Sequence, residues 1–131
     1  MGLDVGSKTI GVSLSDPLRI TTSPLTTLRR TSLDADCEKL LELANHHTVT
    51  GIVIGLPRNM DGSRSETESL IDPILKYLRL SHVDVGLQDE RLSTKAAEKK
   101  MAQENLPISE RKRRKDEFAA AVILEWYIQE L

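Results

Sequence analysis

The stretch Gly51-Ile52-Val53-Ile54-Gly55 decides the fold. It is short, wholly apolar and β-branched, the pattern of a strand buried on both faces of a sheet. Upstream of it, apolar residues recur at helical spacing from Leu33 to Ala44, with Cys37 among them. A helix leading into a doubly buried strand indicates a βαβ crossover and parallel strands. The sequence therefore predicts an α/β fold.

The segment before that helix contains extended structure. Leu3-Asp4-Val5 predicts a strand, Gly6-Ser7-Lys8 a tight turn, and Thr9 to Leu14 a second, alternating strand, which together make a hairpin. A third extended segment is expected from Ile20 to Leu28, where Pro24 confines it to a sheet edge or a bend.

The central part of the chain predicts a loop, a helix and another strand. Leu56 to Arg64 is a loop, and Ser63 with Glu66 three residues later is a capping-box pattern for a helix running towards Leu80. Pro73 implies either a kink or a new helix start with Asp72 as its cap.

The C-terminal part predicts a strand and two helices. After the strand from Val83 to Leu87, Ser93 or Thr94 is expected to cap a helix running to about Glu104. A final helix is expected from about Glu110, and firmly from Asp116, to the C-terminus. The order of elements predicts a mixed five-stranded sheet with helices on both faces.

Composition indicates one globular domain spanning residues 1–131. With 39% hydrophobic and 29% charged residues, the chain is neither disordered nor membrane-like, and no apolar run approaches the roughly 18 residues that a membrane span needs. The single cysteine, Cys37, fits a reducing compartment, so we expect a cytoplasmic protein without a membrane partner.

The charges are segregated along the chain. Five consecutive basic residues, here called the basic run, are Arg111, Lys112, Arg113, Arg114 and Lys115. The rest of the chain has the other 13 of the 18 basic residues and all 20 acidic residues. A run of this kind is either a solvated helix face or a phosphate-binding surface.

Three carboxylates stand where folding alone gives no reason for them. Asp4 interrupts the first strand, Glu90 follows the strand that ends near Leu87, and Asp116 precedes the apolar turns of the last helix. Singly, each has a structural explanation: Asp4 as a turn residue, Glu90 as an ion-pair partner, and Asp116 as a helix-start residue. If they converge at one sheet edge, they would suit Mg²⁺ or Mn²⁺, with positions left for water and phosphate.

Four sequence blocks resemble those of the YqgF family. They are residues 3–12 (LDVGSKTIGV), 53–62 (VIGLPRNMDG) and 89–94 (DERLST), and finally Lys115-Asp116 leading into 119–124 (AAAVIL), in family order over essentially the whole chain. Family members are described both as Holliday-junction-resolvase-like proteins and as nucleases maturing the 5′ end of pre-16S ribosomal RNA. Only Met1, Gly2 and Leu3 precede Asp4, so the first strand is expected to be short.

The resemblance implies an RNase H-like fold and metal-dependent endonuclease chemistry. The family's acids fall on Asp4, Glu90 and Asp116 as catalytic and metal-binding residues, with two ions expected once substrate is bound. Asp89 ranks below Glu90, because a continuing strand would point it to the opposite side. Substrate contacts are expected from Lys8, Arg58, Asn59, Arg91, Arg111, Lys112, Arg113, Arg114 and Lys115. Since only 3% of the residues are aromatic, shape and backbone contacts are favoured over base stacking.

The expected partner is structured RNA or branched DNA, bound by a monomer or weak homodimer. Processing of pre-16S rRNA is favoured through the family, with four-way junction resolution as the alternative. A non-catalytic nucleic-acid-binding module of the same fold is a second alternative, and metal binding would distinguish it from a nuclease. An ATPase of the sugar-kinase and actin type opens with a similar hairpin but needs two lobes, and 131 residues suffice for one.

Overall fold

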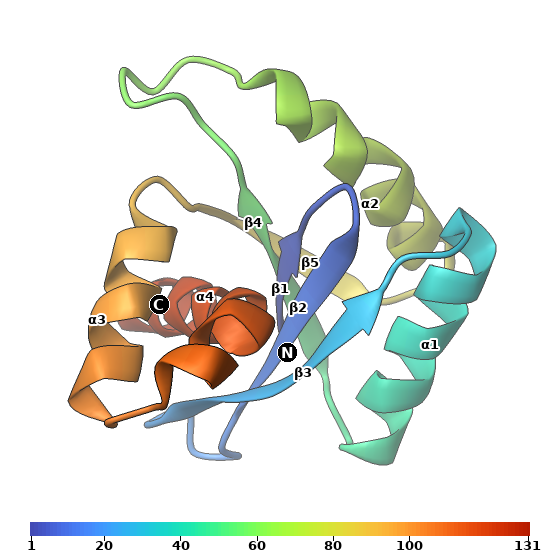
Figure 1. Ribbon diagram of the computed structural model, residues 1–131. Coiled ribbons are helices and arrows are strands. Elements are labelled where there is room, and N and C mark those ends of the chain that lie inside the picture. Colours follow the sequence, from blue (N-terminus) through green and yellow to red (C-terminus); the bar gives the residue numbers. More distant parts are fainter.

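A computed structural model describes residues 1–131 as a mixed five-stranded sheet in the order β3-β2-β1-β4-β5 (Figure 1). The strands are β1 (Gly2–Val5), β2 (Thr9–Ser15), β3 (Thr22–Arg29), β4 (Gly51–Leu56) and β5 (Asp84–Asp89). Strands β1, β4 and β5 run parallel, whereas β2 and β3 complete an antiparallel meander with β1. The predicted sheet is thus confirmed, including the edge position of the strand that contains Pro24.

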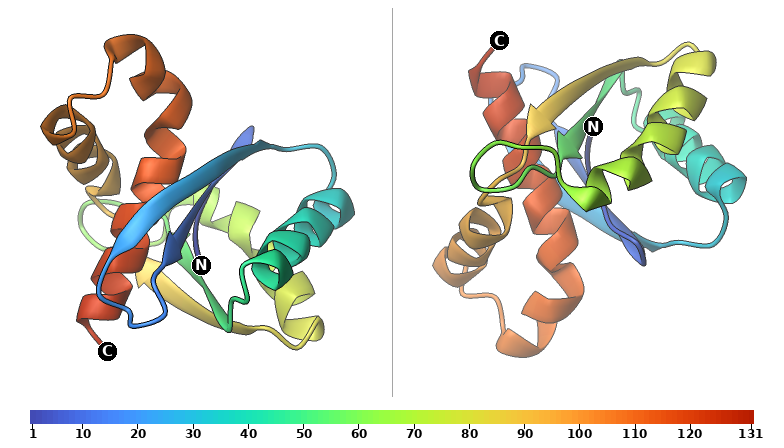
Figure 2. Two further views of the ribbon diagram at one scale, coloured as in Figure 1. Left: turned by 90° about the horizontal axis from the view of Figure 1, so that it is seen from below. Right: turned by 90° about the horizontal axis from the view of Figure 1, so that it is seen from above.

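Two helices cover each face of the sheet (Figures 1 and 2). Helices α1 (Leu33–His46) and α2 (Ile71–Leu80) lie on one face, and α3 (Ser93–Gln103) and α4 (Ile108–Gln129) lie on the other. The main core is on the α1 and α2 side, where Leu3, Ile10 and Ile54 are fully buried. None of the helices has the length and apolar character required to cross a membrane.

Helix α4 crosses the opposite face in contact with glycines of the strands. A Cβ on Gly11 would lie 2.0 Å from the backbone oxygen of Asp116, and one on Gly2 would lie 2.7 Å from that of Ala120. A Cβ on Gly55 would meet Ile123 at 2.6 Å. Only glycine permits this approach, so these positions fix where Asp116 sits above the sheet.

The last helix starts close to the predicted position near Glu110, but the interpretation of Asp116 as a helix-start residue is wrong. The helix begins at Ile108, so the basic run is helical and Asp116 lies inside the helix instead of opening it. Arginine and lysine are good helix formers, and five of them in a row extend the helix towards the N-terminus.

The caps of the helices after β4 and β5 differ from the predictions. Ser65 caps a short 3₁₀ helix (Glu66–Leu70), because the Ser63 hydroxyl instead donates to Asp61 at 2.6 Å. Helix α2 is a new start as one alternative proposed, but neither Asp72 nor any other side chain caps it, and Pro73 lies in its first turn. Neither Ser93 nor Thr94 caps α3, since Leu92 precedes that helix in a left-handed conformation.

Candidate active site

Asp4 and Glu90 meet at the carboxyl edge of the parallel strands. Asp4 alternates with the buried Leu3 and Val5 and therefore faces α4. Glu90 follows β5 directly, and its N–H donates to Leu56 at 3.1 Å, which holds it beside the end of β4. The Glu90 carboxylate uses space that a side chain at Gly55 would occupy, because a Cβ there would lie 2.9 Å from Oε2. These two residues are called the acidic pair below.

The acidic pair is partly buried, and each carboxyl group affects the pKa of the other. The pKa of Asp4 is raised to about 6, chiefly because the group is buried; the hydrogen bond from Glu90 lowers it, Asp116 raises it and Lys115 lowers it. Burial raises the pKa of Glu90 to about 9, followed by the negative charge of Asp4 and the bond to it. The pKa of Glu90 is thus raised more than that of Asp4, and the positive charge of Lys115 only partly offsets the effect of burial on Asp4.

Asp116 lies close enough to Asp4 to raise its pKa, but another residue holds its carboxylate. The Thr9 hydroxyl donates to Asp116 Oδ2 at 2.6 Å. Thr9 is the first residue of β2 and pairs with Arg29 of β3. It lies on the same face of β2 as Gly11, where α4 crosses the strand. The structure thus brings the three predicted acids into one region, with Asp116 bound to Thr9.

The carboxylate oxygens of Asp4, Glu90 and Asp116 are chemically suited to bind a hard divalent cation. Carboxylate oxygens are the ligands that Mg²⁺ and Mn²⁺ prefer, and the carboxyl groups of Asp4 and Glu90 interact directly with each other. No three acidic, histidine or cysteine side chains are gathered closely enough to hold an ion as they stand. Of the three predicted acids, Asp4 and Glu90 interact with each other, whereas the Asp116 carboxylate is bound by Thr9.

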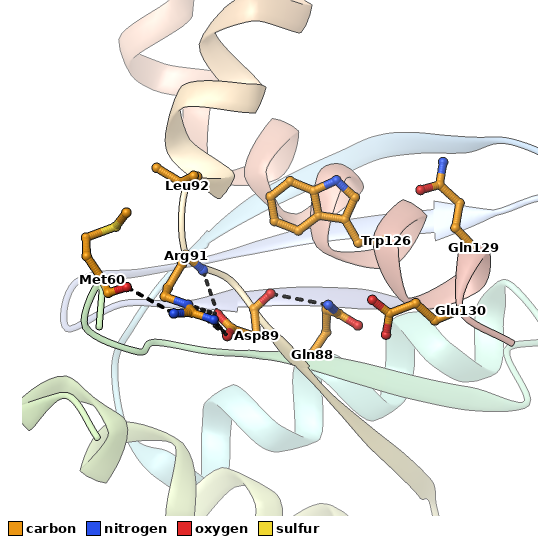
Figure 3. Close-up of a pocket in the computed structure, with 8 residues that line it drawn as sticks. All are labelled: Met60, Gln88, Asp89, Arg91, Leu92, Trp126, Gln129 and Glu130. Atoms are coloured by element: carbon orange, nitrogen blue, oxygen red, sulfur yellow. Dashed lines mark hydrogen bonds and ion pairs between the residues drawn. The ribbon is translucent and has the colours of Figure 1, made fainter. Parts of the chain in front are cut away.

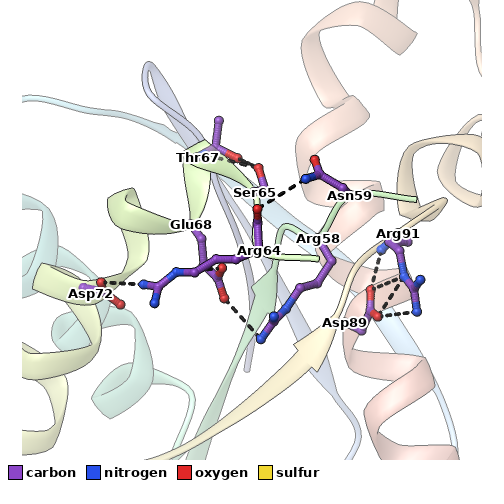
Figure 4. A network of polar contacts seen from close by, with 9 residues as sticks. All are labelled: Arg58, Asn59, Arg64, Ser65, Thr67, Glu68, Asp72, Asp89 and Arg91. Atoms are coloured by element: carbon purple, nitrogen blue, oxygen red, sulfur yellow. Dashed lines mark hydrogen bonds and ion pairs between the residues drawn. The ribbon is translucent and has the colours of Figure 1, made fainter. Parts of the chain in front are cut away.

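The loop after β4 is closed by its own side chains (Figure 4). Asn59 donates its amide to Ser63 at 3.0 Å and to the Arg64 backbone oxygen at 3.2 Å, so this predicted substrate residue also shapes the turn. Arg58 contacts the buried Glu68 at 3.3 Å, and Arg64 contacts the same carboxylate at 3.0 Å. Glu68 therefore anchors the loop through two arginines.

Arg91 connects this loop to the end of β5 (Figure 4). Its Nε donates to Asp89 at 2.9 Å and its Nη1 donates to the Met60 backbone oxygen at 3.0 Å. The guanidinium is therefore directed at Asp89, and Glu90 is left to face Asp4. Lys8, by contrast, is exposed in the β1–β2 turn.

The basic run divides into two groups on α4. Arg111 donates to the Leu106 backbone oxygen at 2.7 Å, and Arg114 is paired with the buried Glu117 and lies over the Phe118 ring. Lys112, Arg113 and Lys115 are exposed, although Arg113 has a loose contact with Glu110 at 3.8 Å. Lys115 is the member whose charge acts on Asp4.

Three residues that bear on the site were not singled out by sequence reasoning. Thr9 alternates with Gly11 along β2, a pattern that places it towards α4. No sequence pattern marks Glu68 as a buried residue, because its burial depends on how the loop folds back. Trp126, the only tryptophan, was hidden in the continuation of an apolar helix.

Fold and site together define an RNase H-like α/β protein with an acidic centre at the carboxyl edge of its parallel strands. The chain belongs to the family described as "RuvX: Holliday junction resolvase", whose model matches residues 1–130. The resemblance to YqgF proteins is thereby confirmed.

Curated relatives match over nearly the full length of both chains. A protein of Desulforamulus reducens is 42% identical over 129 residues, covering 98% of this chain and 94% of its own, and bears the name "Putative pre-16S rRNA nuclease". A protein of Moorella thermoacetica with the same name is 43% identical, covering 100% and 94%. Among solved structures, RuvC of T. thermophilus in complex with a Holliday junction substrate aligns with a TM-score of 0.56 at 14% identity, covering 98% and 93%. At that identity the likeness establishes the fold.

Proposed function

We propose that this chain is a divalent-metal-dependent nuclease that hydrolyses phosphodiester bonds of structured nucleic acid, and that its substrate is the 5′ region of pre-16S rRNA. The observation that carries the proposal is the convergence of Asp4 and Glu90, from segments far apart in the sequence, into one partly buried acidic pair close to Asp116. The names of the relatives support the choice of substrate.

Each residue has a distinct part in this proposal. Asp4 and Glu90 would hold Mg²⁺ or Mn²⁺, and such an ion would supply an activated water and offset negative charge on the phosphate. Asp116 completes the ligand set, and the Thr9 hydroxyl keeps its carboxylate oriented until then. Lys115 and Lys8 are exposed and available for phosphate contacts, whereas Arg58 and Arg91 act mainly by ordering the loop.

Resolution of four-way DNA junctions is the second candidate, because the family's description names it. Paired cuts in a junction require two active sites related by symmetry, and so a homodimer. Processing of a single RNA strand requires one site.

The proposal is tested by incubating a pre-16S leader transcript and a four-way DNA junction with the wild type and Asp4→Asn, in Mg²⁺ and in Mn²⁺. We expect Asp4→Asn to lose more than about 100-fold in cleavage rate, since removing even a residue that supports a metal ligand costs 10–100-fold. Asp84→Asn, an exposed acid at the other end of β5, is the matched control and should cut normally. Undiminished cleavage by Asp4→Asn contradicts the assignment, and binding without cleavage by the wild type indicates a non-catalytic module.

A further inference from the structure

A pocket of about 400 Å³ lies at the carboxyl end of β5, the edge strand of the sheet (Figure 3). Its volume lies within the range of small-molecule sites. Apolar side chains of Met60, Leu92 and Trp126 line it together with the polar side chains of Gln88, Gln129 and Glu130. The pocket is therefore built from the loop after β4, the end of β5 and the last turns of α4.

Trp126 provides a fixed planar wall. It packs against the small core formed between α3 and α4, and it also lines the pocket. Met60 and Leu92, at 67% and 51% exposed, extend the apolar surface at the mouth of the pocket. An indole held in place by packing and open on another side can stack on a flat aromatic ligand at little entropic cost.

The charges of the pocket disfavour a phosphate. The positive charge of Arg91 is neutralised by Asp89 at 2.8 Å, and Glu130 adds a negative charge without a basic partner. The Gln88 amide nitrogen donates to the Asp89 backbone oxygen at 3.4 Å, which leaves its side-chain oxygen to accept. The pocket thus suits an uncharged planar group that carries hydrogen-bond donors, as the exocyclic amines of nucleobases do.

The pocket and the proposed catalytic centre share one segment of the chain. Gln88 and Asp89 precede Glu90 in the chain, and Arg91 and Leu92 follow it. Both therefore lie at the carboxyl end of β5, where a strand bound at the acidic pair can reach the pocket.

We propose that this pocket receives one unstacked base of the nucleic acid strand bound at the acidic pair, with Trp126 as its stacking partner and the Gln88 and Glu130 oxygens as acceptors. The inference deepens the proposed nuclease function and rests on it. It adds one stacking contact to the shape and backbone contacts that the low aromatic content favours, because one well-placed indole suffices for one base.

Because Trp126 is the only tryptophan, its fluorescence reports directly on the pocket. The experiment titrates Asp4→Asn protein, which binds without cutting, with an RNA strand of about eight nucleotides and with a series of the same strand carrying one abasic position each. We expect the intact strand to quench Trp126 and one abasic position to abolish the quenching. Loss of that stack should weaken binding by about 5- to 100-fold.

Variants separate stacking from folding. In the same background, Trp126→Phe should retain the sensitivity to the abasic position and Trp126→Leu should lose it, with both proteins folded by circular dichroism. Leu80→Ala, which removes an exposed apolar side chain at the end of α2, is the matched control and should bind like its parent. Binding that is equally tight for every abasic strand, while the wild type still cleaves, overturns the pocket and leaves the nuclease. If the protein neither binds nor cleaves RNA or DNA, both the pocket and the nuclease function are overturned.

Discussion

At the scale of single residues, the acidic pair makes the stability of the metal-free protein depend on pH. Asp4 and Glu90 have pKa values of about 6 and about 9 in the folded protein, above their ordinary values of 3.8 and 4.5. The folded state therefore binds more protons than the unfolded state between those limits. Their contribution to stability is complete below about pH 4 and is lost as the pH rises through 6 and towards 9.

We predict that in a chelating buffer the urea midpoint of the wild type falls between about pH 5 and pH 9, and that Glu90→Gln falls much less, because the neutral amide cannot ionise. Glu98→Gln, at an exposed position of α3, should retain the wild-type slope. Equal slopes for wild type and Glu90→Gln would mean that the pair does not share a proton in solution.

Gly11 is the residue that sets the height of α4 above the sheet. Gly11→Ala places a Cβ 2.0 Å from the Asp116 backbone oxygen, and neither backbone can yield without moving the helix. We predict a loss of about 1–3 kcal/mol in the free energy of unfolding, together with reduced cleavage because Asp116 is displaced. Urea unfolding and the cleavage assay measure the two effects.

Gly51→Ala is the control for that experiment. A Cβ there meets nothing closer than 3.6 Å, so we expect a change within about 0.5 kcal/mol and normal cleavage. Equal effects at both glycines would show that close approach of α4 is not what requires Gly11.

At the scale of elements, the sequence predicts those parts whose pattern is set by burial. The strand at residues 51–55 was predicted from its continuous apolar run and the first helix from its apolar periodicity, and the structure contains both. The residues that cap the helices were predicted less well than the helices themselves, because a cap depends on which hydroxyl group is free to accept a hydrogen bond. Ser63 is occupied by Asp61, and Leu92 takes a left-handed conformation that local sequence does not favour.

The loop after β4 depends on one buried carboxylate. Glu68 is held between Arg58 and Arg64 (Figure 4), so Glu68→Gln removes the charge that attracts both guanidinium groups. We predict that trypsin then cuts after Arg58 or Arg64 several-fold faster, because a loosened loop opens more often. Glu66→Gln, two residues away and exposed, should leave the cleavage rate unchanged. Unaltered proteolysis of Glu68→Gln would mean that the loop is held by its other contacts.

At the scale of the whole molecule, the site is assembled from segments far apart in the chain. Convergence of Asp4 and Glu90 could be predicted, because the carboxyl ends of parallel strands meet at one edge. The bond from Thr9 to Asp116 and the exposure of Trp126 to a pocket could not, because both depend on where α4 packs. The glycines that determine this packing are visible in the sequence, but their partners are not.

The segregation of charge gives the last prediction. An acidic protein approaches a polyanion through its positive surface, and on α4 the exposed members of the basic run are Lys112, Arg113 and Lys115. Arg114 is bound to Glu117, so its replacement would test helix stability instead of binding. The double variant Lys112→Gln, Arg113→Gln leaves the acidic pair and Lys115 in place.

We predict that this variant binds RNA more weakly and that the slope of log affinity against log salt is reduced by about 1.5, since each lost phosphate contact removes 0.7 to 0.9. The matched control, Lys39→Gln with Lys76→Gln, removes the same charge from the exposed surfaces of α1 and α2, on the opposite side of the sheet. If binding depends on net charge alone, both variants weaken it alike. If α4 carries the phosphate contacts, only the first changes the slope, and a slope unchanged in both would make the basic run a solvated helix face.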